Sequence, residues 1–194
     1  GAARNEADAA ILRAASEIGF MTVRGVPGDA LAASTRRRLL AIFGLPEGKK
    51  DDMCRRSFVP ANPNVYRGWF PLQDGHPTYK EGTDLGPDLV RAIAHDPRDP
   101  LTEPTPLPAE ADLPGWRAAA AGYYRAMEET GGVLMRALAR GLGLPERSFA
   151  PAFENGISTL RLIRYPVRDP ARLDPTLRAG AGYMLGAPHA DSGL

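Results

Sequence analysis

The sequence predicts an α+β fold from two kinds of periodicity. Apolar residues recur at helical spacing over residues 6–18 and, in a longer stretch, from Trp116 to about Gly141. Residues 158–165 instead alternate apolar and polar side chains, which is typical of a strand that is buried on one face. A chain of 194 residues is long enough to form one domain with a substantial core.

Four short elements are predicted in the first third of the chain. Residues 6–18 are expected to form a helix that Gly19 ends. Residues 20–23 are a short apolar run closed by a glycine and a proline, which predicts a buried strand. A second helix is expected over 29–43, capped by its first aspartate, and a further helical turn over 49–53.

The middle of the chain is rich in proline and glycine. These residues break any long regular element within 57–90, and the prolines of 96–114 are typical of a stiff connector. The first stretch also holds a cluster of aromatic residues: Phe58, Tyr66, Trp69, Phe70 and Tyr79. A loop with so many rings is predicted to pack against the rest of the protein.

The longest helix is predicted from Trp116 to about Gly141. Its expected apolar stripe is Tyr123, Met127, Leu134, Met135, Leu138 and Leu142. Two glycines within it, Gly131 and Gly132, each cost roughly 1 kcal/mol relative to alanine. A close helix contact or a kink is therefore expected there, and a short helix is expected to follow over 146–152.

Charge and composition limit the classes of partner. The formal net charge of +1 argues against nucleic acid or a membrane surface as the main partner, and the basic run 36–38 is predicted to be a solvated helix face. No apolar run is long enough to span a membrane, and no signal-peptide pattern opens the chain. The single cysteine, Cys54, suits a cytoplasmic location, and nearby positive charge could lower the pKa of an otherwise incidental thiol.

The chemically informative pair is His189 and Asp191. It follows the predicted strand 158–165, which Pro166 stops, and a polar loop expected over 168–180. Side chains two positions apart on a strand share a face, so an imidazole and a carboxylate would converge on one point. They would supply two of the ligands in the two-histidine, one-carboxylate set of non-haem iron(II) oxygenases. A surface hydrogen bond is the alternative, because His-x-Asp is a short and unspecific pattern.

Five segments follow one another in an order that points to a known family. They contain Gly-Phe-Met-Thr-Val at 19–23, Arg-Gly-Trp at 67–69 with Lys-Glu-Gly-Thr-Asp-Leu-Gly at 80–86, Leu-Pro-Gly-Trp at 113–116, Arg-Tyr-Pro at 164–166 and His-Ala-Asp-Ser-Gly at 189–193. Each match is weak alone. In this order they resemble the isopenicillin N synthase-like family of iron(II)- and 2-oxoglutarate-dependent oxygenases, over nearly the whole chain.

The resemblance implies a double-stranded β-helix, or jelly roll, with the long helix packed outside it. Residues 1–115 would form its N-terminal helical and strand region, and 116–194 the long helix and the first strands of the catalytic core. The resemblance also implies that His189 and Asp191 bind iron(II) and that 2-oxoglutarate is the cosubstrate. No residue is assigned as a general acid or base.

Two further site residues are implied by the same resemblance. Tyr165 matches a tyrosine that contacts the carboxylate of the cosubstrate or substrate, and a core tyrosine at a strand end is the alternative. Arg67 matches a region on the substrate side of some relatives, where it would bind a substrate carboxylate; a surface position is the alternative. Arg161 and Arg164 are left unassigned.

The family's distal histidine ligand, and the Arg-x-Ser that binds 2-oxoglutarate, lie beyond His-x-Asp in relatives. The other two histidines here, His76 in a turn and His95 at a helix end, are both expected to be exposed. The C-terminal half of the jelly roll is therefore expected to be missing from this sequence.

The predicted function is the oxidation of a small organic substrate by O2, with iron(II) and 2-oxoglutarate. A catalytically inactive binding module of the same fold, and an iron oxidase that does not use 2-oxoglutarate, are the alternatives. A hydrolase built on Ser192 is disfavoured because no Gly-x-Ser-x-Gly turn is present. Neither the identity of the substrate nor the oligomeric state follows from the sequence.

Overall fold

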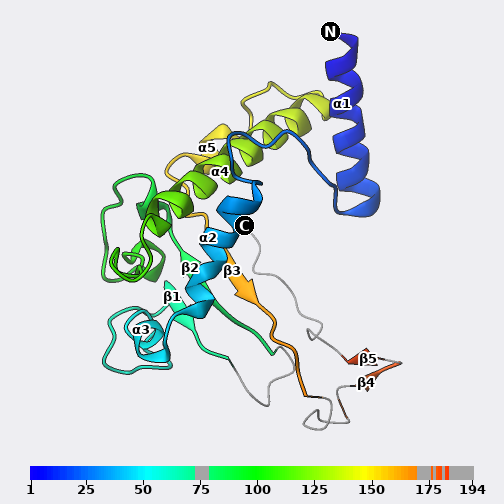
Figure 1. Cartoon of the computed structure of the whole chain (residues 1–194). Helices are drawn as coiled ribbons and strands as arrows, with labels where there is room; N and C mark the ends of the chain where they lie inside the picture. The colour runs from blue at the N-terminus through cyan, green and yellow to red at the C-terminus, as the bar shows by residue number, and fades with distance from the viewer. Residues whose placement is uncertain (73–78, 170–175, 177, 181, 184–194) are drawn as a thin grey trace. The chain divides into compact units, whose positions relative to one another are not determined.

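The computed structural model describes residues 1–72, 79–169, 176, 178–180 and 182–183 (Figure 1). The chain forms two compact units, each built from segments that are distant in the sequence. The helical unit comprises Gly1–Ile42, Pro87–Ala94 and Ala109–Ser158, and the sheet unit comprises Phe43–Gly86, His95–Pro108 and the chain from Thr159 onward. The predicted α+β class is confirmed by the helices and the antiparallel strands.

The first predicted helix is present, but the strand predicted after it is not. Helix α1 spans Ala2–Arg13 and continues as a π-helical turn over Ala14–Ile18, which Gly19 ends at φ +86°. Residues 20–23 run irregularly, and Phe20 is 76% exposed. The predicted buried strand is wrong because a short apolar run becomes a strand only where another strand offers hydrogen bonds.

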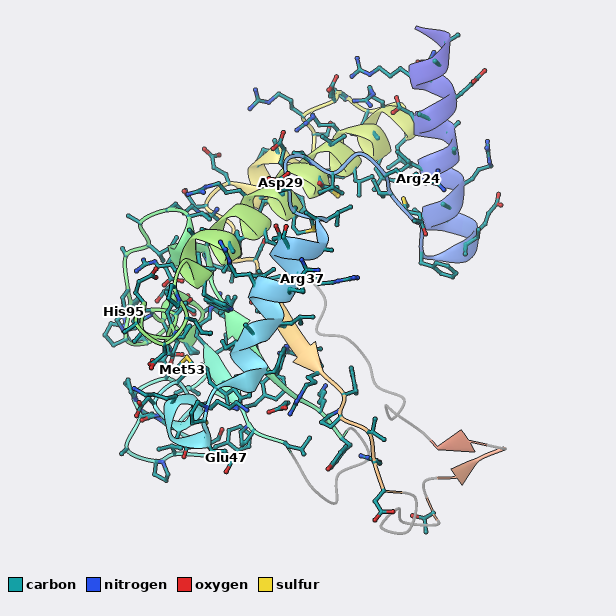
Figure 2. All side chains as sticks on the ribbon, in the orientation of Figure 1. Arg24, Asp29, Arg37, Glu47, Met53 and His95 are labelled. Carbon is teal, nitrogen blue, oxygen red and sulfur yellow. The ribbon has the colours of Figure 1, made fainter. Side chains whose placement is uncertain are left out.

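The second helix begins later than expected. Helix α2 spans Ala33–Leu40, and a 3-10 turn over Ala41–Gly44 continues it. Asp29 does not cap it; its carbonyl instead accepts a hydrogen bond from the backbone N–H of Ala32, in a turn before the helix. Residues 36–38 are exposed as predicted, and Figure 2 labels Arg37 on this helix.

Helix α4 organises the helical unit and spans Trp116–Gly141, the range that the periodicity predicts. The Nε1–H of Trp116 donates to the carbonyl of Leu39 at 3.0 Å, which joins α4 to α2. Near its other end, Arg140 donates to both carboxylate oxygens of Asp8 at 2.6 and 2.7 Å, which joins α4 to α1. This pairing holds the pKa of Asp8 below its ordinary value, chiefly through the hydrogen bond from Arg140.

The packed face of α4 differs from the predicted apolar stripe. The buried residues are mainly small: Trp116, Ala120, Ala121, Tyr124, Ala126, Ala137 and Ala139. The predicted stripe is only half-buried, and Leu142 is 54% exposed. The close helix contact also lies elsewhere, because nothing lies within 4 Å of a β-carbon built on Gly131, whereas one on Gly141 would meet the Asp8 carbonyl oxygen at 3.2 Å. Short side chains thus let α1 and α2 approach α4.

The sheet unit contains a three-stranded antiparallel sheet in the order β1-β2-β3 (Figure 1). Its strands are β1 (Gly68–Phe70), β2 (Glu81–Leu85) and β3 (Leu160–Arg164). Thr83, at the centre of β2, lies opposite Trp69 on one side and Leu162 on the other. Strand β3 confirms the alternation at 158–165, whereas β1 and β2 lie in the stretch where no regular element was predicted.

Short elements complete the two units. They are α3 (Glu47–Asp51), the 3-10 turns η3 (Pro87–Leu89) and η4 (Pro100–Thr102), α5 (Ala150–Phe153), and the strand pair β4 (Arg178–Ala179) and β5 (Gly182–Tyr183). Helices α3 and α5 confirm the helical turns expected near 49–53 and 146–152. Within the part of the chain that the structure describes, no helix is both long and apolar enough to cross a membrane.

Candidate functional site

Two of the five segments that resemble the oxygenase family supply all three strands of one sheet. Arg-Gly-Trp enters β1, Glu-Gly-Thr-Asp-Leu forms β2, and the segment ending in Arg-Tyr-Pro forms β3. Each strand is hydrogen-bonded along its length to its neighbour. Similarities that are scattered along the sequence are therefore adjacent in space.

One face of the sheet carries a buried carboxylate between two arginines. Asp84 of β2 is fully buried, and Arg161, directly opposite on β3, donates to it from Nε at 2.5 Å and from Nη2 at 2.7 Å. Arg55 makes a further short ion pair with the same carboxylate. Both guanidinium groups lie over the ring of Phe70, at 5.1 Å for Arg55 and 5.6 Å for Arg161. The Asp84 carboxylate thus links β2 to β3 and to the loop that contains Arg55.

The two arginines differ in their surroundings. The pKa of Arg161 is raised, chiefly by its hydrogen bond to Asp84. The pKa of Arg55 is lowered, chiefly because burial disfavours its charge, although Asp84 acts in the opposite direction. Arg55 is the more buried of the two, with 17% of its side chain exposed against 41% for Arg161. Arg55 therefore depends more heavily on the carboxylate.

The other face of the sheet repeats the arrangement with Glu81. This residue is 4% exposed and pairs with Arg164, which lies opposite it on β3, and with Lys50 at 3.7 Å. Lys50 also lies 5.2 Å from the centre of the Trp69 ring. Each carboxylate of β2 therefore has an arginine of β3 and a cation from residues 50–55 as its partners.

Arg67 is fully buried, so the alternative of a surface position is wrong. Its guanidinium donates to the carbonyls of Leu85 at 3.3 Å and Leu101 at 3.2 Å, and to the hydroxyl of Thr159 at 2.5 Å. The carboxylate of Glu103 accepts backbone N–H bonds from residues 65–67 at 2.8, 2.9 and 3.1 Å. These contacts hold the entry to β1 in place, and a direct contact of Arg67 with substrate stays a prediction.

Tyr165 is 50% exposed and directly follows β3. Strand alternation, carried one residue beyond β3, puts it on the same face as Ile163 and Arg161. Its predicted contact with a carboxylate is not tested by these contacts and stays a prediction.

The predicted iron ligands His189 and Asp191 lie outside the residues that the structure describes, and so does His76. Within the described ranges, no three histidine, cysteine, aspartate or glutamate side chains are grouped to hold a metal ion. His95, labelled in Figure 2, is exposed as predicted. Its Nδ1 lies 3.2 Å from the carbonyl oxygen of Thr102.

Cys54 is buried, and the suggestion of a lowered pKa is wrong. Burial, with a smaller effect from Asp51, raises the pKa of its thiol to about 11. We expect iodoacetamide to alkylate the folded chain at pH 7.5 about a hundredfold more slowly than a free thiol, because the thiolate is the nucleophile. Mass spectrometry can follow the single site. Equal rates with and without urea would contradict the burial of this thiol.

Curated proteins with similar sequences show which kind of protein the chain resembles. No family model matches the sequence. Isopenicillin N synthase of Streptomyces clavuligerus is 34% identical over 127 residues, which cover 63% of this chain and 38% of that protein. Proline hydroxylase buaE of Petromyces alliaceus is 32% identical over 185 residues, which cover 93% of this chain and 54% of that protein. The chain therefore spans about half or less of the length of these relatives.

A solved structure agrees with the sequence relatives. A C-terminally truncated Neurospora crassa protein in its apo form matches with a TM-score of 0.65 at 25% identity, over 85% of this chain and 58% of that one. The full-length form of that protein has been solved in complex with α-ketoglutarate, which is 2-oxoglutarate. Over most of its length the chain is thus similar to members of the isopenicillin N synthase-like family of iron(II)- and 2-oxoglutarate-dependent oxygenases.

Proposed function

We propose that the protein is a non-haem iron(II) oxygenase that uses 2-oxoglutarate to oxidise a small organic substrate. The observation that carries the proposal is the assembly of two family-like segments into one three-stranded sheet that leads into Tyr165. Several relatives, in addition, are named 2-oxoglutarate-dependent dioxygenases. In this proposal β3 is among the first strands of a jelly roll formed by residues 116–194 with α4 outside it, and residues 1–115 form the N-terminal region.

Iron(II) would be held by His189 and Asp191, whose nitrogen and oxygen donors suit that ion. Held by these residues, iron(II) would supply O2 activation and a binding position for the keto acid. Tyr165 would donate its phenolic hydrogen to a carboxylate of the cosubstrate, for which its exposed position after β3 leaves room. Arg67 would bind a carboxylate of the substrate, and its contacts with Leu85, Leu101 and Thr159 would hold the guanidinium in place.

The test is conversion of 2-oxoglutarate to succinate by the full-length protein. We expect iron-dependent succinate formation in the wild type and its loss in Asp191→Ala, because one of three protein ligands is removed. Iron retained after desalting gives a second readout, and it should fall in the same variant. Asp52→Ala, an exposed aspartate, is the control and should leave both unchanged.

Two results would contradict the proposal. Unchanged turnover and iron content in Asp191→Ala would remove the assignment of this ligand. Iron-dependent O2 consumption that needs no 2-oxoglutarate would instead identify an oxidase of the same family. The relatives leave the substrate open, since one is named a proline hydroxylase and the Neurospora crassa protein has been solved with thymine.

A further inference from the structure

We infer that the substrate carries a carboxylate or a similar anionic group, and that Arg161 binds it through the side of its guanidinium that faces away from Asp84. This inference deepens the proposed function and rests on it. Its basis is the charge balance, the geometry and the strand face of Arg161.

The first argument is the charge balance of the Asp84 cluster. One carboxylate lies between two guanidinium groups, so the cluster has one positive charge in excess. Asp84 is fully buried, and only 17% of the Arg55 side chain is exposed. By contrast, 41% of the Arg161 side chain is exposed. Among the described residues, the excess charge is therefore most accessible on the Arg161 side. An anion placed there would relieve the repulsion between the two arginines.

The second argument is the geometry of the Arg161 guanidinium. Its Nε and Nη2 both donate to Asp84, at 2.5 and 2.7 Å, which fixes the plane of the group. Among the described residues, Nη1 has no hydrogen-bond partner. A guanidinium held in this way offers a pre-oriented donor edge, and charge-assisted hydrogen bonds to carboxylates are among the stronger ones in proteins.

The third argument is the strand face. Arg161, Ile163 and Tyr165 alternate with Leu162 and Arg164, so Arg161 shares a face with the tyrosine proposed to bind the cosubstrate. Ile163 supplies an apolar surface between the two polar groups. The arrangement suits a substrate with an apolar body and one anionic end.

Arg164 provides a matched control within the same strand. Like Arg161, it pairs with a buried carboxylate of β2, and its side chain is 49% exposed. It lies on the opposite face, with its guanidinium 5.8 Å from the centre of the Phe43 ring. Loss of either arginine removes one partner of a buried carboxylate, but only Arg161 is on the Tyr165 face.

The test measures binding of acids and their matching amides to the full-length protein. The probes are benzoate with benzamide, and N-acetylproline with N-acetylprolinamide. Oxygen is excluded and 2-oxoglutarate is kept saturating, so that the cosubstrate site is filled. Titration calorimetry should show at least one acid binding about tenfold or more tightly than its amide, the effect of one charge-assisted hydrogen bond. Arg161→Gln should abolish this preference, and Arg164→Gln should keep it.

Each possible outcome decides the matter. The inference is overturned if the wild type binds every acid and its amide equally, or binds none of them. It is also overturned if Arg161→Gln and Arg164→Gln lose the preference for the acid to the same extent. If Arg161→Gln fails to fold, Arg161→Lys must weaken acid binding several-fold and leave amide binding unchanged, or the inference is wrong. Binding needs no turnover: Arg161-dependent acid binding without succinate formation would refute the proposed oxygenase activity alone.

Discussion

Replacing Asp84 with alanine is expected to lower the free energy of unfolding by about 3 kcal/mol, the lower end of the range for breaking a buried ion pair. Asp84 is fully buried, and its loss leaves the largely buried Arg55 guanidinium without the carboxylate that stabilises its charge. The cost stays at the lower end because Arg161, 41% exposed, can turn toward solvent. Urea unfolding of the chain, followed by circular dichroism, measures the change.

The control for this prediction is an exposed pair in the same unit. Asp96 pairs with Arg98 at 3.0 Å, but the arginine side chain is 90% exposed and water replaces the contact readily. Asp96→Ala should therefore cause a loss several times smaller. Similar losses for the two variants would show that burial of the Asp84 pair does not matter to stability.

Replacing Gly82 with alanine is expected to cost about 3 kcal/mol, the upper end of the range for overpacking. A β-carbon at position 82 would fall inside contact distance of the Leu162 carbonyl oxygen and 2.7 Å from Cζ of Phe70. The carbonyl belongs to the neighbouring strand, so it cannot move without disturbing the pairing of β2 with β3. The same urea experiment measures the loss.

Gly131→Ala is the matched control for this substitution. Nothing lies within 4 Å of a β-carbon at that position, which is inside helix α4. The change should therefore stabilise the chain by about 1 kcal/mol, the difference in helix propensity between glycine and alanine. A loss of stability in both variants would mean that space around the β-carbon does not decide the outcome.

The elements that the sequence predicted well are those whose hydrogen bonds or side-chain pattern are local. Helix α4 was predicted at its full length because a helix bonds within itself and repeats its pattern over several turns. Strand β3 was predicted because apolar and polar residues largely alternate over 158–165 before Pro166 stops the pattern. The buried face of α4 was not predicted correctly. Which face is buried depends on the helices that pack against α4, and these come from other parts of the chain.

Strands β1 and β2 could not be predicted in the same way. β1 has three residues, and β2 has the sequence Glu-Gly-Thr-Asp-Leu, which no apolar alternation marks as a buried strand. All five residues of β2 are buried because partners from both sides cover them. The charges of Glu81 and Asp84 are balanced by arginines about eighty positions away, a pairing that local spacing does not reveal.

The candidate site was predicted only in part for the same reason. Family resemblance selected Arg67 and Tyr165, and the structure shows one buried and the other half-exposed. It did not assign Arg161, because alternation alone could not say which face of β3 looks inward. A sequence signal did exist: strand segments that carry charged residues at buried positions need opposite charges on their neighbours.

The two carboxylates of β2 also determine how β2 aligns with β3. Glu81 faces Arg164 and Asp84 faces Arg161, on opposite sides of the sheet. A slip of one position would put Asp84 opposite Leu162 and Glu81 opposite Tyr165, which would leave both acids buried without a cation. A misaligned pairing of β2 with β3 would thus be destabilised by two unpaired buried carboxylates. The same two ion pairs therefore also fix the position of Tyr165, which follows β3.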